Sequence, residues 1–594
     1  MDAMDKTGNW GSDYLARLMR CLGLEYIALT PGSSFRGIHD SLVNHLGNHA
    51  PEILTTLHEE HAVAIAHGYA KVTGKPMGAF LHANVGLMHG AMAIFNAWCD
   101  RVPMLVFGAT GPVDGARRRP WIDWLHTTKD QASMVRSFLK WDGEPASLAA
   151  ARDDMLRAYR IASTPPCGPT YLCFDSELQE AWFDALPGFP SVERYDPPTP
   201  SVPAPALVAD LAQRLLAARA PVILAGRVSR KEDDWARRVA LAEHLGAKVI
   251  TDFKVPGAFP TWHPLHTAPA GYALDRRAIE VLKAADLILS LDWLDLAGTL
   301  HTAFGTAEPG AYLVQVSLDE SLHQGVGGEQ QAAAPADAYA MCCPDAFTGC
   351  LLSELRRRSK PAMAAQARAA ATGTGERVPG TGDPHAGEMS VSAFASQMSE
   401  FLERQRPACL VRTNLGWPGD AHVLDHPLDY LGYDGGGGVG SGPGMAVGAA
   451  LALRGESRLP VAVLGDGDFL MGATALWTAV NYRIPLLVVV ANNRSFYNDE
   501  IHQERVALLR GRPVENKGIG QRIEGIDIAA LAHSMGAEGF GPVSSAAELQ
   551  TALDEALARV RAGGVAVIDA LVAREYGAAM ASGLMRHAQV EESS

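Results

Sequence analysis

The chain has 594 residues, more than one hydrophobic core usually serves, so we expect three or four domains. Hydrophobic residues make up 47% and charged residues 20%, as in ordinary globular proteins, and the net charge of −15 argues against a general nucleic-acid binder. The first twenty residues form no apolar signal segment, and no run reaches the ~18 apolar residues that a membrane helix needs. The eight cysteines form no CxxC pair, which indicates reduced thiols. We therefore expect a soluble cytoplasmic protein without a membrane or nucleic-acid partner.

The first block, residues 1–190, alternates helix and strand signals. Helices are expected over 13–22 and 59–71, and strands over 26–29, 77–82, 103–107 and 169–174. Such alternation is typical of a doubly wound α/β domain.

Two further blocks follow a proline-rich linker over 195–205. The second block, 205–355, has strand patterns over 221–225, 248–251, 287–291 and 312–316. Residues 356–388 are rich in Ala, Gly, Thr and Pro and are expected to be a linker, and residues 581–594 a disordered tail. With the third block, 389–580, the sequence predicts three doubly wound α/β domains.

The strongest chemical signal lies within residues 459–499. An apolar run ends on Gly465-Asp466-Gly467, a helical pattern follows over 473–482, and a second apolar run ends on Asn492-Asn493. The two strands of a βαβ unit are parallel, so their carboxyl ends open on the same edge of the sheet. Carboxylate, amide and carbonyl oxygens suit Mg2+, and the glycines let backbone N–H groups approach an anion. The stretch predicts a site for a metal-bridged diphosphate.

A second constellation lies in the first block, where His58-Glu59-Glu60-His61 opens a helical pattern. On that helix Glu59 shares a face with Val63 and further apolar residues. A carboxylate on such a face is desolvated, so we expect a raised pKa and a role in donating or sharing a proton. The alternative is a glutamate placed at a helix N-terminus by the helix dipole. A zinc site is not expected, because HEEH lacks the HExxH spacing and a third ligand.

Taken together, the GDG and NN motifs and the glutamate-bearing helix resemble the thiamine-diphosphate-dependent enzymes, in particular the 2-oxo-acid decarboxylase and acetolactate-synthase-like family. The resemblance covers nearly the whole chain and implies a pyrimidine-binding, a middle and a diphosphate-binding domain, in that order. It also implies an active site between the first domain of one subunit and the third domain of another. A homodimer or homotetramer is therefore expected.

The resemblance implies roles for individual residues. Mg2+ would be bound by Asp466, by the side chain of Asn493 and by the backbone carbonyl of Ser495. The residues implied in cofactor binding are Gly437, Val439, Gly467, Asp468, Thr413 and Asn414. Asp468 departs from the family, in which a small residue is commoner, so its side chain must point away from the phosphates or be screened by the metal.

The glycine-rich segment 433–442 looks like the family's pyrimidine-facing loop. By resemblance, Val439 would wedge the cofactor into a bent shape, and the carbonyl of Gly437 would accept a hydrogen bond from the pyrimidine amino group. The spacing of Gly435, Gly437 and Gly440 also fits a dinucleotide-binding GxGxxG, but no clear strand precedes it.

Glu59 matches the family's cofactor-activating glutamate. The resemblance implies that it hydrogen-bonds the pyrimidine ring and favours the imino tautomer, which takes the proton from C2 of the thiazolium. The resulting ylid would attack a substrate carbonyl, and the cofactor would then act as an electron sink through an enamine.

Further stretches are similar to the benzoylformate decarboxylases, namely Pro31-Gly32-Ser33 and residues 81–86. In that group the equivalents of Ser33 and His82 reach into the substrate pocket, and His82 would act as an acid or base. The alternative is that His82 serves only the fold. The group draws a second histidine from its middle domain, for which His301 is the candidate here.

Two sets of arginines remain open between substrate binding and plain solvation. They are Arg117, Arg118 and Arg119 in the first block and Arg505, Arg510 and Arg512 after the Asn pair.

The sequence therefore predicts an enzyme that decarboxylates a 2-oxo acid, joins its carbon skeleton to a second carbonyl compound, or does both. The alternatives are a lyase that cleaves an acyloin, a diketone or a 2-hydroxyacyl thioester, and an acetolactate-synthase-type carboligase. The last would carry FAD in the middle domain, for which residues 224–227 alone are insufficient. A regulatory protein with a dead site is disfavoured by the intact Glu59, Asp466 and Asn493.

Overall fold

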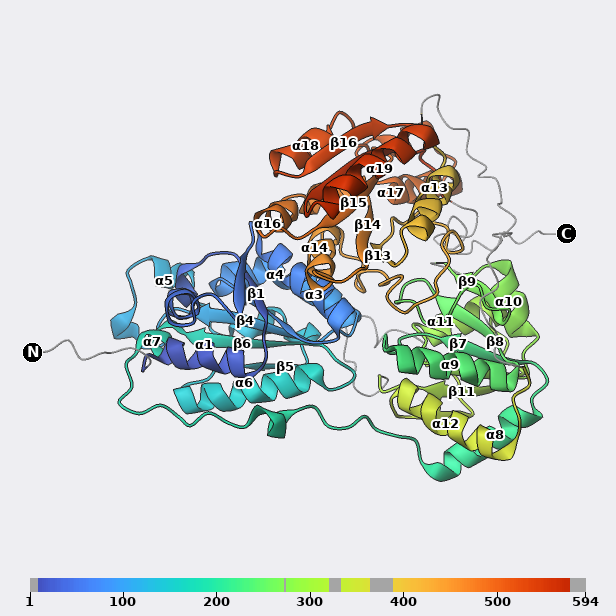
Figure 1. Ribbon diagram of the computed structural model, residues 1–594, viewed down its shortest axis with the longest axis horizontal. Coiled ribbons are helices and arrows are strands. Elements are labelled where there is room, and N and C mark those ends of the chain that lie inside the picture. The colour runs from blue at the N-terminus through green and yellow to red at the C-terminus, as the bar shows by residue number, and fades with distance from the viewer. Residues whose placement is uncertain (1–8, 272–273, 320–332, 364–387, 577–594) are drawn as a thin grey trace, which may run out of the picture.

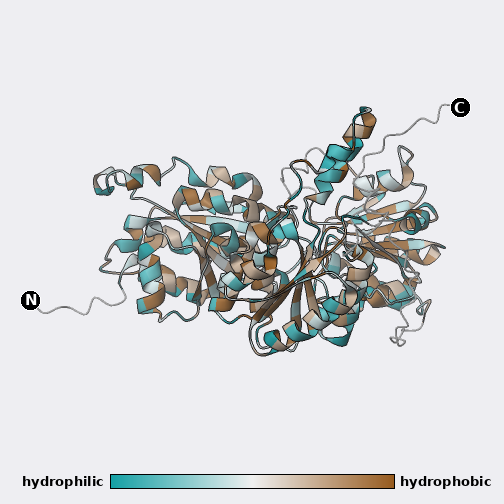
Figure 2. Ribbon diagram, turned by 90° about the horizontal axis from the view of Figure 1, so that it is seen from above, coloured by the Kyte–Doolittle hydropathy of each residue, from teal (hydrophilic) through white to brown (hydrophobic). Residues whose placement is uncertain are grey.

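The computed structural model describes residues 9–271, 274–319, 333–363 and 388–576, and it folds into three α/β domains, each built on its own parallel sheet (Figure 1). Most of the expected linker and the expected tail lie outside the described residues. Figure 2 shows apolar strands inside each domain, with helices of mixed hydropathy around them. This is the layer arrangement of doubly wound α/β domains, as predicted.

The first domain contains a six-stranded sheet in the order β2-β1-β3-β4-β6-β5. Its strands are β1 (Tyr26–Leu29), β2 (Glu52–Thr55), β3 (Met77–Leu81), β4 (Met104–Thr110), β5 (Trp141–Gly143) and β6 (Pro169–Asp175). Its helices are α1 (Gly11–Cys21), α2 (Arg36–Asp40), α3 (Glu59–Thr73), α4 (Ala83–Cys99), α5 (Ile122–Leu125), α6 (Leu148–Ser163) and α7 (Ser176–Glu180). The six expected elements are all present, most of them within one or two residues of their predicted ends and β4 extending to Thr110.

The middle domain contains a second six-stranded sheet, ordered β12-β11-β10-β7-β8-β9. Its strands are β7 (Pro221–Ala225), β8 (Lys248–Asp252), β9 (His266–Ala270), β10 (Leu287–Leu291), β11 (Tyr312–Val316) and β12 (Ala338–Ala340). Its helices are α8 (Pro205–Ala217), α9 (Glu232–Leu245), α10 (Arg276–Lys283), α11 (Leu296–Phe304) and α12 (Pro344–Arg358). The strand order reverses between β7 and β10, where an open α/β sheet forms its crevice.

The third domain contains a five-stranded sheet in the order β13-β14-β15-β17-β16. Its strands are β13 (Ala408–Arg412), β14 (Leu459–Gly465), β15 (Leu486–Asn492), β16 (Glu538–Val543) and β17 (Val565–Leu571). Its helices are α13 (Val391–Arg404), α14 (Gly442–Ala452), α15 (Asp466–Gly472), α16 (Ala475–Asn481), α17 (Tyr497–Leu509), α18 (Ile528–Ser534) and α19 (Ala546–Arg561).

One expectation for the third domain was wrong. The sequence predicted that one strand ends on Gly465-Asp466-Gly467 and that the helix begins at residue 473, but helix α15 already starts at Asp466. The two glycines therefore stand at the start of a helix, and a second short helix, α16, completes the crossover to β15.

Helices α3 and α14 join the first domain to the third (Figure 1). A Cβ atom at Gly68 would lie 2.0 Å from the carbonyl oxygen of Met445, and one at Gly448 would lie 1.9 Å from that of Ile65. Glycine at both positions thus lets the two helix backbones approach closely. A single apolar cluster runs from β3 through α3 and α14 to β14 and β15.

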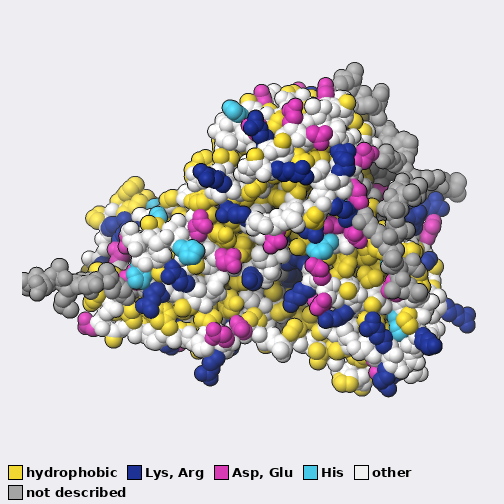
Figure 3. Space-filling view, viewed as in Figure 1, with side chains coloured by type: hydrophobic (Ala, Val, Ile, Leu, Met, Phe, Trp, Pro, Cys, Tyr) yellow, Lys and Arg dark blue, Asp and Glu magenta, His cyan; other side chains and the backbone are white. Residues whose placement is uncertain are grey.

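The surface carries charges of both signs. On the face seen in Figure 3, basic and acidic side chains of the described residues are interspersed. Within the described ranges, we find no helix with the length and apolar content that crossing a membrane requires.

Candidate active site

The carboxyl ends of β14 and β15 bring the predicted metal ligands together. The two strands are parallel neighbours, and Asp466 and Asn493 directly follow them. Asp466 Oδ2 and Asn493 Oδ1 both accept the backbone N–H of Ser495, at 3.2 and 2.9 Å. Asp466 and Asn493, which are far apart in the sequence, thus present oxygen atoms at one point of the sheet edge, beside the backbone of Ser495.

Burial shapes the chemistry of this point. Asp466 is 3% exposed, and desolvation raises the pKa of its carboxyl to about 6. The Ser495 hydroxyl donates to the buried Glu500, so it is the backbone of Ser495 that remains to face Asp466. Asn492, the other member of the Asn pair, has a structural role, since its side chain donates a hydrogen bond to Asp569 on β17.

The cofactor-binding candidates of the third domain lie around the same edge. A Cβ atom at Gly467 would lie 2.6 Å from the ring of Phe496, so a larger residue there would require that ring to move. Thr413 and Asn414 directly follow β13, which pairs with β14, and Asn414 Oδ1 is buried without a hydrogen-bond partner among the described residues. An orphaned acceptor at this edge is suited to a polar ligand.

The glycine-rich segment forms an exposed loop before α14. Gly437 and Val439 are exposed at its tip, with positive φ at Gly437. Strand β13 ends more than twenty residues earlier, at Arg412, so the segment lacks the strand that a dinucleotide-binding GxGxxG requires. Asp468 Oδ1 accepts the backbone N–H of Gly440 at 2.7 Å, so its side chain is turned toward this loop.

Glu59 is the first residue of α3 and is buried, in keeping with its predicted apolar face. Its Oε2 pairs with Nδ1 of His89 on α4 at 3.1 Å. Oε1 faces Gly86, where a Cβ atom would come within 3.1 Å of it, and it has no hydrogen bond from the described residues. One carboxylate oxygen is thus held while the other is left for a ligand.

The surroundings of Glu59 include a grouping of metal-ligand type that the sequence did not reveal. One atom from each of His58, Glu59 and His89 lies within 4.8 Å of the others, whereas His61, the second histidine of HEEH, is not part of this grouping. However, His58 Nδ1 accepts the N–H of Glu60 as the cap of α3. A neutral imidazole with that bond carries its proton on Nε2 and has no second lone pair for a metal. We therefore do not assign a metal to this grouping.

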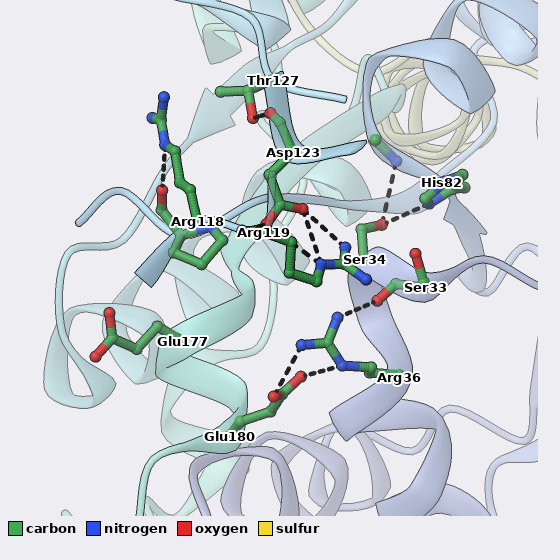
Figure 4. Close-up of polar contacts among 12 residues, drawn as sticks. Ser33, Ser34, Arg36, His82, Arg118, Arg119, Asp123, Thr127, Glu177 and Glu180 are labelled. Carbon is green, nitrogen blue, oxygen red and sulfur yellow. Dashed lines mark hydrogen bonds and ion pairs between the residues drawn. The ribbon is translucent and has the colours of Figure 1, made fainter. Parts of the chain in front are cut away.

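His82 follows β3, and its partner is Ser34 (Figure 4). Ser34 Oγ lies 2.9 Å from His82 Nδ1 and also accepts the N–H of Ala83. Burial lowers the pKa of His82, so its imidazole is neutral near pH 7. Ser34 can then donate to Nδ1, which leaves the ring proton on Nε2.

The predicted Ser33 lies one residue away and is held through its backbone. Arg36 donates to the carbonyl oxygen of Ser33 at 3.0 Å and is itself paired with Glu180 (Figure 4). Ser33 and Arg36 also line an open groove of about 550 Å³. The sequence therefore singled out the neighbour of the residue that contacts His82.

The first arginine set is engaged within the protein. Arg117 pairs with Glu177, and Arg118 donates to the carbonyl oxygen of Pro112. Arg119 pairs with Asp123 (Figure 4). These contacts favour a structural role for residues 117–119. Arg510 and Arg512 of the second set lie on the surface beyond the end of α17. His301, the candidate for a second histidine, is also exposed and lies on α11.

Comparisons with known proteins agree with this arrangement. Three family models match the chain: the N-terminal TPP binding domain of thiamine pyrophosphate enzymes over residues 9–134, the central domain over 208–323, and the C-terminal TPP binding domain over 417–570.

Individual relatives extend over most of the chain. Benzoylformate decarboxylase of Pseudomonas aeruginosa is 27% identical over 85% of this chain and 89% of its own. The large subunit of acetolactate synthase isozyme 1 of Escherichia coli is 24% identical over 83% of each chain. The crystal structure of benzoylformate decarboxylase from Polynucleobacter necessarius has the same fold, with a TM-score of 0.75, 22% identity, and 96% and 99% of the two chains covered. With its three domains in the family's order and its glutamate and oxygen-donor sites in the first and third, the chain belongs to the thiamine pyrophosphate enzymes.

Proposed function

We propose that this enzyme binds thiamine diphosphate with Mg2+ and uses it to cleave or form the carbon–carbon bond next to the carbonyl of a 2-oxo acid, by decarboxylation, carboligation or both. The observation that carries the proposal is the presence of two half-sites in one chain. One half-site is the Glu59 carboxylate in the first domain, and the other is the set of oxygen donors at the edge of the third sheet. Oxygen atoms of Asp466 and Asn493 converge at the edge of the third sheet, and Glu59 presents an unpaired oxygen from the first domain. When bound, the cofactor supplies a carbon nucleophile and an electron sink.

The donor set at the sheet edge fits a hard cation. Asp466 and Asn493 offer a carboxylate and an amide oxygen, and the backbone of Ser495 lies beside both. Mg2+ takes such oxygen ligands and usually keeps water or phosphate in its other positions. Burial destabilises the ionised carboxylate of Asp466 and so raises its pKa. A bound cation would offset this effect and favour the ionised form.

Glu59 would hold or share a proton with the cofactor ring. His89 fixes Oε2, so Oε1 is the oxygen that faces the ligand. Burial beside Val63 and Gly86 excludes water from the carboxylate, which strengthens its hydrogen bonds.

His82 would serve the substrate as an acid or base. It stands at the carboxyl end of β3, the edge at which α/β sheets bind ligands. Its neutral imidazole, oriented by Ser34, would place a proton on Nε2 that it can give to an oxygen atom and take back.

The two half-sites are proposed to meet between two copies of the chain. Helix α3 faces its own third domain through Glu60 and His61, which bond to Ser441 and Thr474. Glu59 lies on another face of the helix, against α4. Apolar side chains next to both half-sites are exposed in the single chain, namely Leu57, Met88, Val439 and Met471. A second copy would cover them, as a homodimer interface does.

An acetolactate-synthase-type enzyme with FAD is disfavoured by the middle domain. Its crevice, between the ends of β7 and β10, holds Arg227 paired with Asp292 and Asp319. Arg101 of the first domain pairs with the same Asp319. Paired charged side chains thus occupy the crevice at which an open α/β sheet binds ligands, and both arginines are already engaged by carboxylates. We expect the purified protein to be colourless and to show no flavin absorbance.

The test is turnover of a panel of 2-oxo acids, aldehydes and acyloins, with and without Mg2+ and thiamine diphosphate. We expect release of CO2 or formation of an acyloin from at least one 2-oxo acid, only when metal and cofactor are both present. Asp466→Asn should abolish it, while the surface variant Asp184→Asn should not. Cleavage of acyloins without any turnover of 2-oxo acids would contradict the proposal and favour the lyase.

A further inference from the structure

The loop over residues 435–441 is held at both ends by aspartates. Near its start, Gly437 N–H donates to Asp434 Oδ1 at 2.9 Å. At its end, the N–H groups of Gly440 and Gly442 donate to Asp468 Oδ1 at 2.7 and 3.3 Å. The tip between these anchors, which includes Val439, is exposed.

A single arginine ties the two anchors together. Arg412, the last residue of β13, donates from Nη1 to Asp434 Oδ2 at 2.6 Å, and its Nε lies 3.3 Å from Asp468 Oδ2. The side chains of all three residues are less than 10% exposed. Burying two carboxylates and a guanidinium is costly unless each finds partners. Asp434 has Arg412 and the Gly437 N–H, whereas Asp468 accepts both of its loop N–H groups on Oδ1 and holds Oδ2 by the ion pair with Arg412 alone, without a hydrogen bond from the described residues.

The loop backbone is adapted to this cluster. A Cβ atom at Gly442 would lie 2.1 Å from Asp468 Oδ2, so the carboxylate occupies space that only glycine leaves. Gly437 and Gly440 adopt φ angles of 73° and 107°, which disfavour other residues. Asp468 therefore stands where the loop is shaped around a carboxylate.

We propose that Asp434, Arg412 and Asp468 form a charged clamp that fixes the curvature of the 435–441 loop, and that Asp468 is thereby a positioning residue for the pyrimidine half of thiamine diphosphate. The proposal rests on the proposed function, because it places the cofactor in this site. It accounts for an aspartate directly after Gly467, a residue that is proposed to face the diphosphate.

The competing explanation is that Asp468 is a tolerated substitution whose charge only repels the phosphates. The two explanations predict opposite changes. Removal of the carboxylate should loosen the loop and weaken cofactor binding if the clamp acts, whereas it should strengthen the binding of any diphosphate if repulsion dominates.

The experiment measures the affinity of the cofactor-free protein for two ligands by calorimetry with Mg2+ present. Thiamine diphosphate needs both the loop and the sheet edge, whereas inorganic pyrophosphate probes only the sheet edge. For Asp468→Ser we expect thiamine diphosphate to bind at least tenfold more weakly and pyrophosphate to bind within twofold of the wild type. Arg412→Gln removes the guanidinium that links Asp434 to Asp468 but leaves both carboxylates. It should likewise weaken the binding of thiamine diphosphate and leave the binding of pyrophosphate nearly unchanged.

Three comparisons keep the result interpretable. Asp184→Ser changes an exposed aspartate of the first domain that has no contact with the loop, and as the matched control it should change neither affinity. If Asp468→Ser does not fold, the isosteric Asp468→Asn, which keeps one oxygen for the loop N–H groups but faces Arg412 with an amide, should show a smaller loss of the same kind. Unchanged or tighter binding of both ligands by these variants would overturn the clamp alone. Failure of the wild type to bind thiamine diphosphate would overturn the proposed function with it.

Discussion

Two adjacent glutamates on α3 have different surroundings and different parts to play. Glu59 packs against α4 and pairs with His89. Glu60, one residue later, accepts a hydrogen bond from Ser441 of the glycine-rich loop, and burial raises its pKa. The helical rotation of about 100° per residue separates them, so one carboxylate faces the proposed ligand and the other supports the loop.

At the same scale, Ser34 rather than Ser33 should control His82. Ser34→Ala removes the partner of Nδ1 and an acceptor for the Ala83 N–H. We expect kcat to fall roughly ten- to hundredfold, since a misoriented acid–base group loses its alignment. The affinity for thiamine diphosphate should stay unchanged. Steady-state kinetics of Ser34→Ala and Ser33→Ala check this, and a larger loss for Ser33→Ala would show that the predicted serine is the one that matters.

At the scale of elements, the crossing of α3 and α14 fixes how the first and third domains sit. Gly448→Ala would drive a methyl group into the backbone carbonyl of Ile65. Overpacking of this kind costs about 1–3 kcal/mol or more, and a backbone neighbour cannot rotate away. We expect a clearly lower thermal midpoint in scanning calorimetry.

The matched control for this substitution is Gly349→Ala in the middle of α12, where the nearest atom to a new Cβ is 3.9 Å away. There the substitution should be neutral or stabilise by up to about 1 kcal/mol, because alanine favours the helix. Equal effects of the two substitutions would mean that α3 and α14 do not pack as described.

The contact between α3 and the third domain should make the stability of the protein depend on pH. His61 on α3 bonds to Thr474, and burial lowers its pKa from 6.5 to about 4. Between pH 6.5 and 4 this histidine therefore binds a proton more readily in the unfolded chain than in the folded one. The free energy of unfolding thus falls as the pH falls through that window, by up to about 3 kcal/mol from His61. The buried Asp466, with its pKa raised to about 6, changes stability in the opposite direction.

A variant isolates the histidine. His61→Gln keeps a polar partner for Thr474 but cannot titrate, so its thermal midpoint should fall less than that of the wild type between pH 7 and 4.5. Parallel curves for the two proteins would contradict a buried neutral His61.

The strands that the sequence predicted share one property. β7, β10, β14 and β15 are nearly continuous apolar runs, because a parallel strand is buried on both faces. Edge strands such as β5 (Trp141–Gly143) and β12 (Ala338–Ala340) are three residues long and carry no such pattern. The start of α15 at Asp466 was missed because glycines on either side indicate a turn.

The site residues also divide into those that the sequence could predict and those that it could not. Asp466 and Asn493 were predictable as neighbours because the βαβ rule fixes where the ends of two strands lie. His89, Ser34 and Arg412 have no local signal, since their importance comes from contacts with residues 22 to 56 positions away in the chain. Contacts of that kind are set by packing rather than by periodicity.

At the scale of the whole molecule, the proposed site needs two chains. Coexpression of Glu59→Gln and Asp466→Asn chains offers a direct test. In a mixed dimer with sites between subunits, one site combines both defects and the other combines the intact Glu59 of one chain with the intact Asp466 of its partner. We expect activity to return to about half of the wild type per mixed dimer, as complementation at a shared site requires.

Purified mixed dimers carrying two different affinity tags would give this measurement, with each single variant assayed alone as the control. A site built within one chain predicts no recovery, because every chain then carries a defect. Mixed dimers as inactive as the single variants would therefore refute the shared site.

Glu59 is proposed to activate a bound thiamine diphosphate. The most direct measurement is the rate at which the proton at C2 of the bound cofactor exchanges with deuterium, followed by NMR after acid quench. We predict exchange at least about a hundredfold faster in the wild type than in Glu59→Gln, the lower end of what a positioned acid–base group contributes. The exposed-site variant Glu555→Gln should match the wild type. Equal exchange in the wild type and Glu59→Gln would contradict the account.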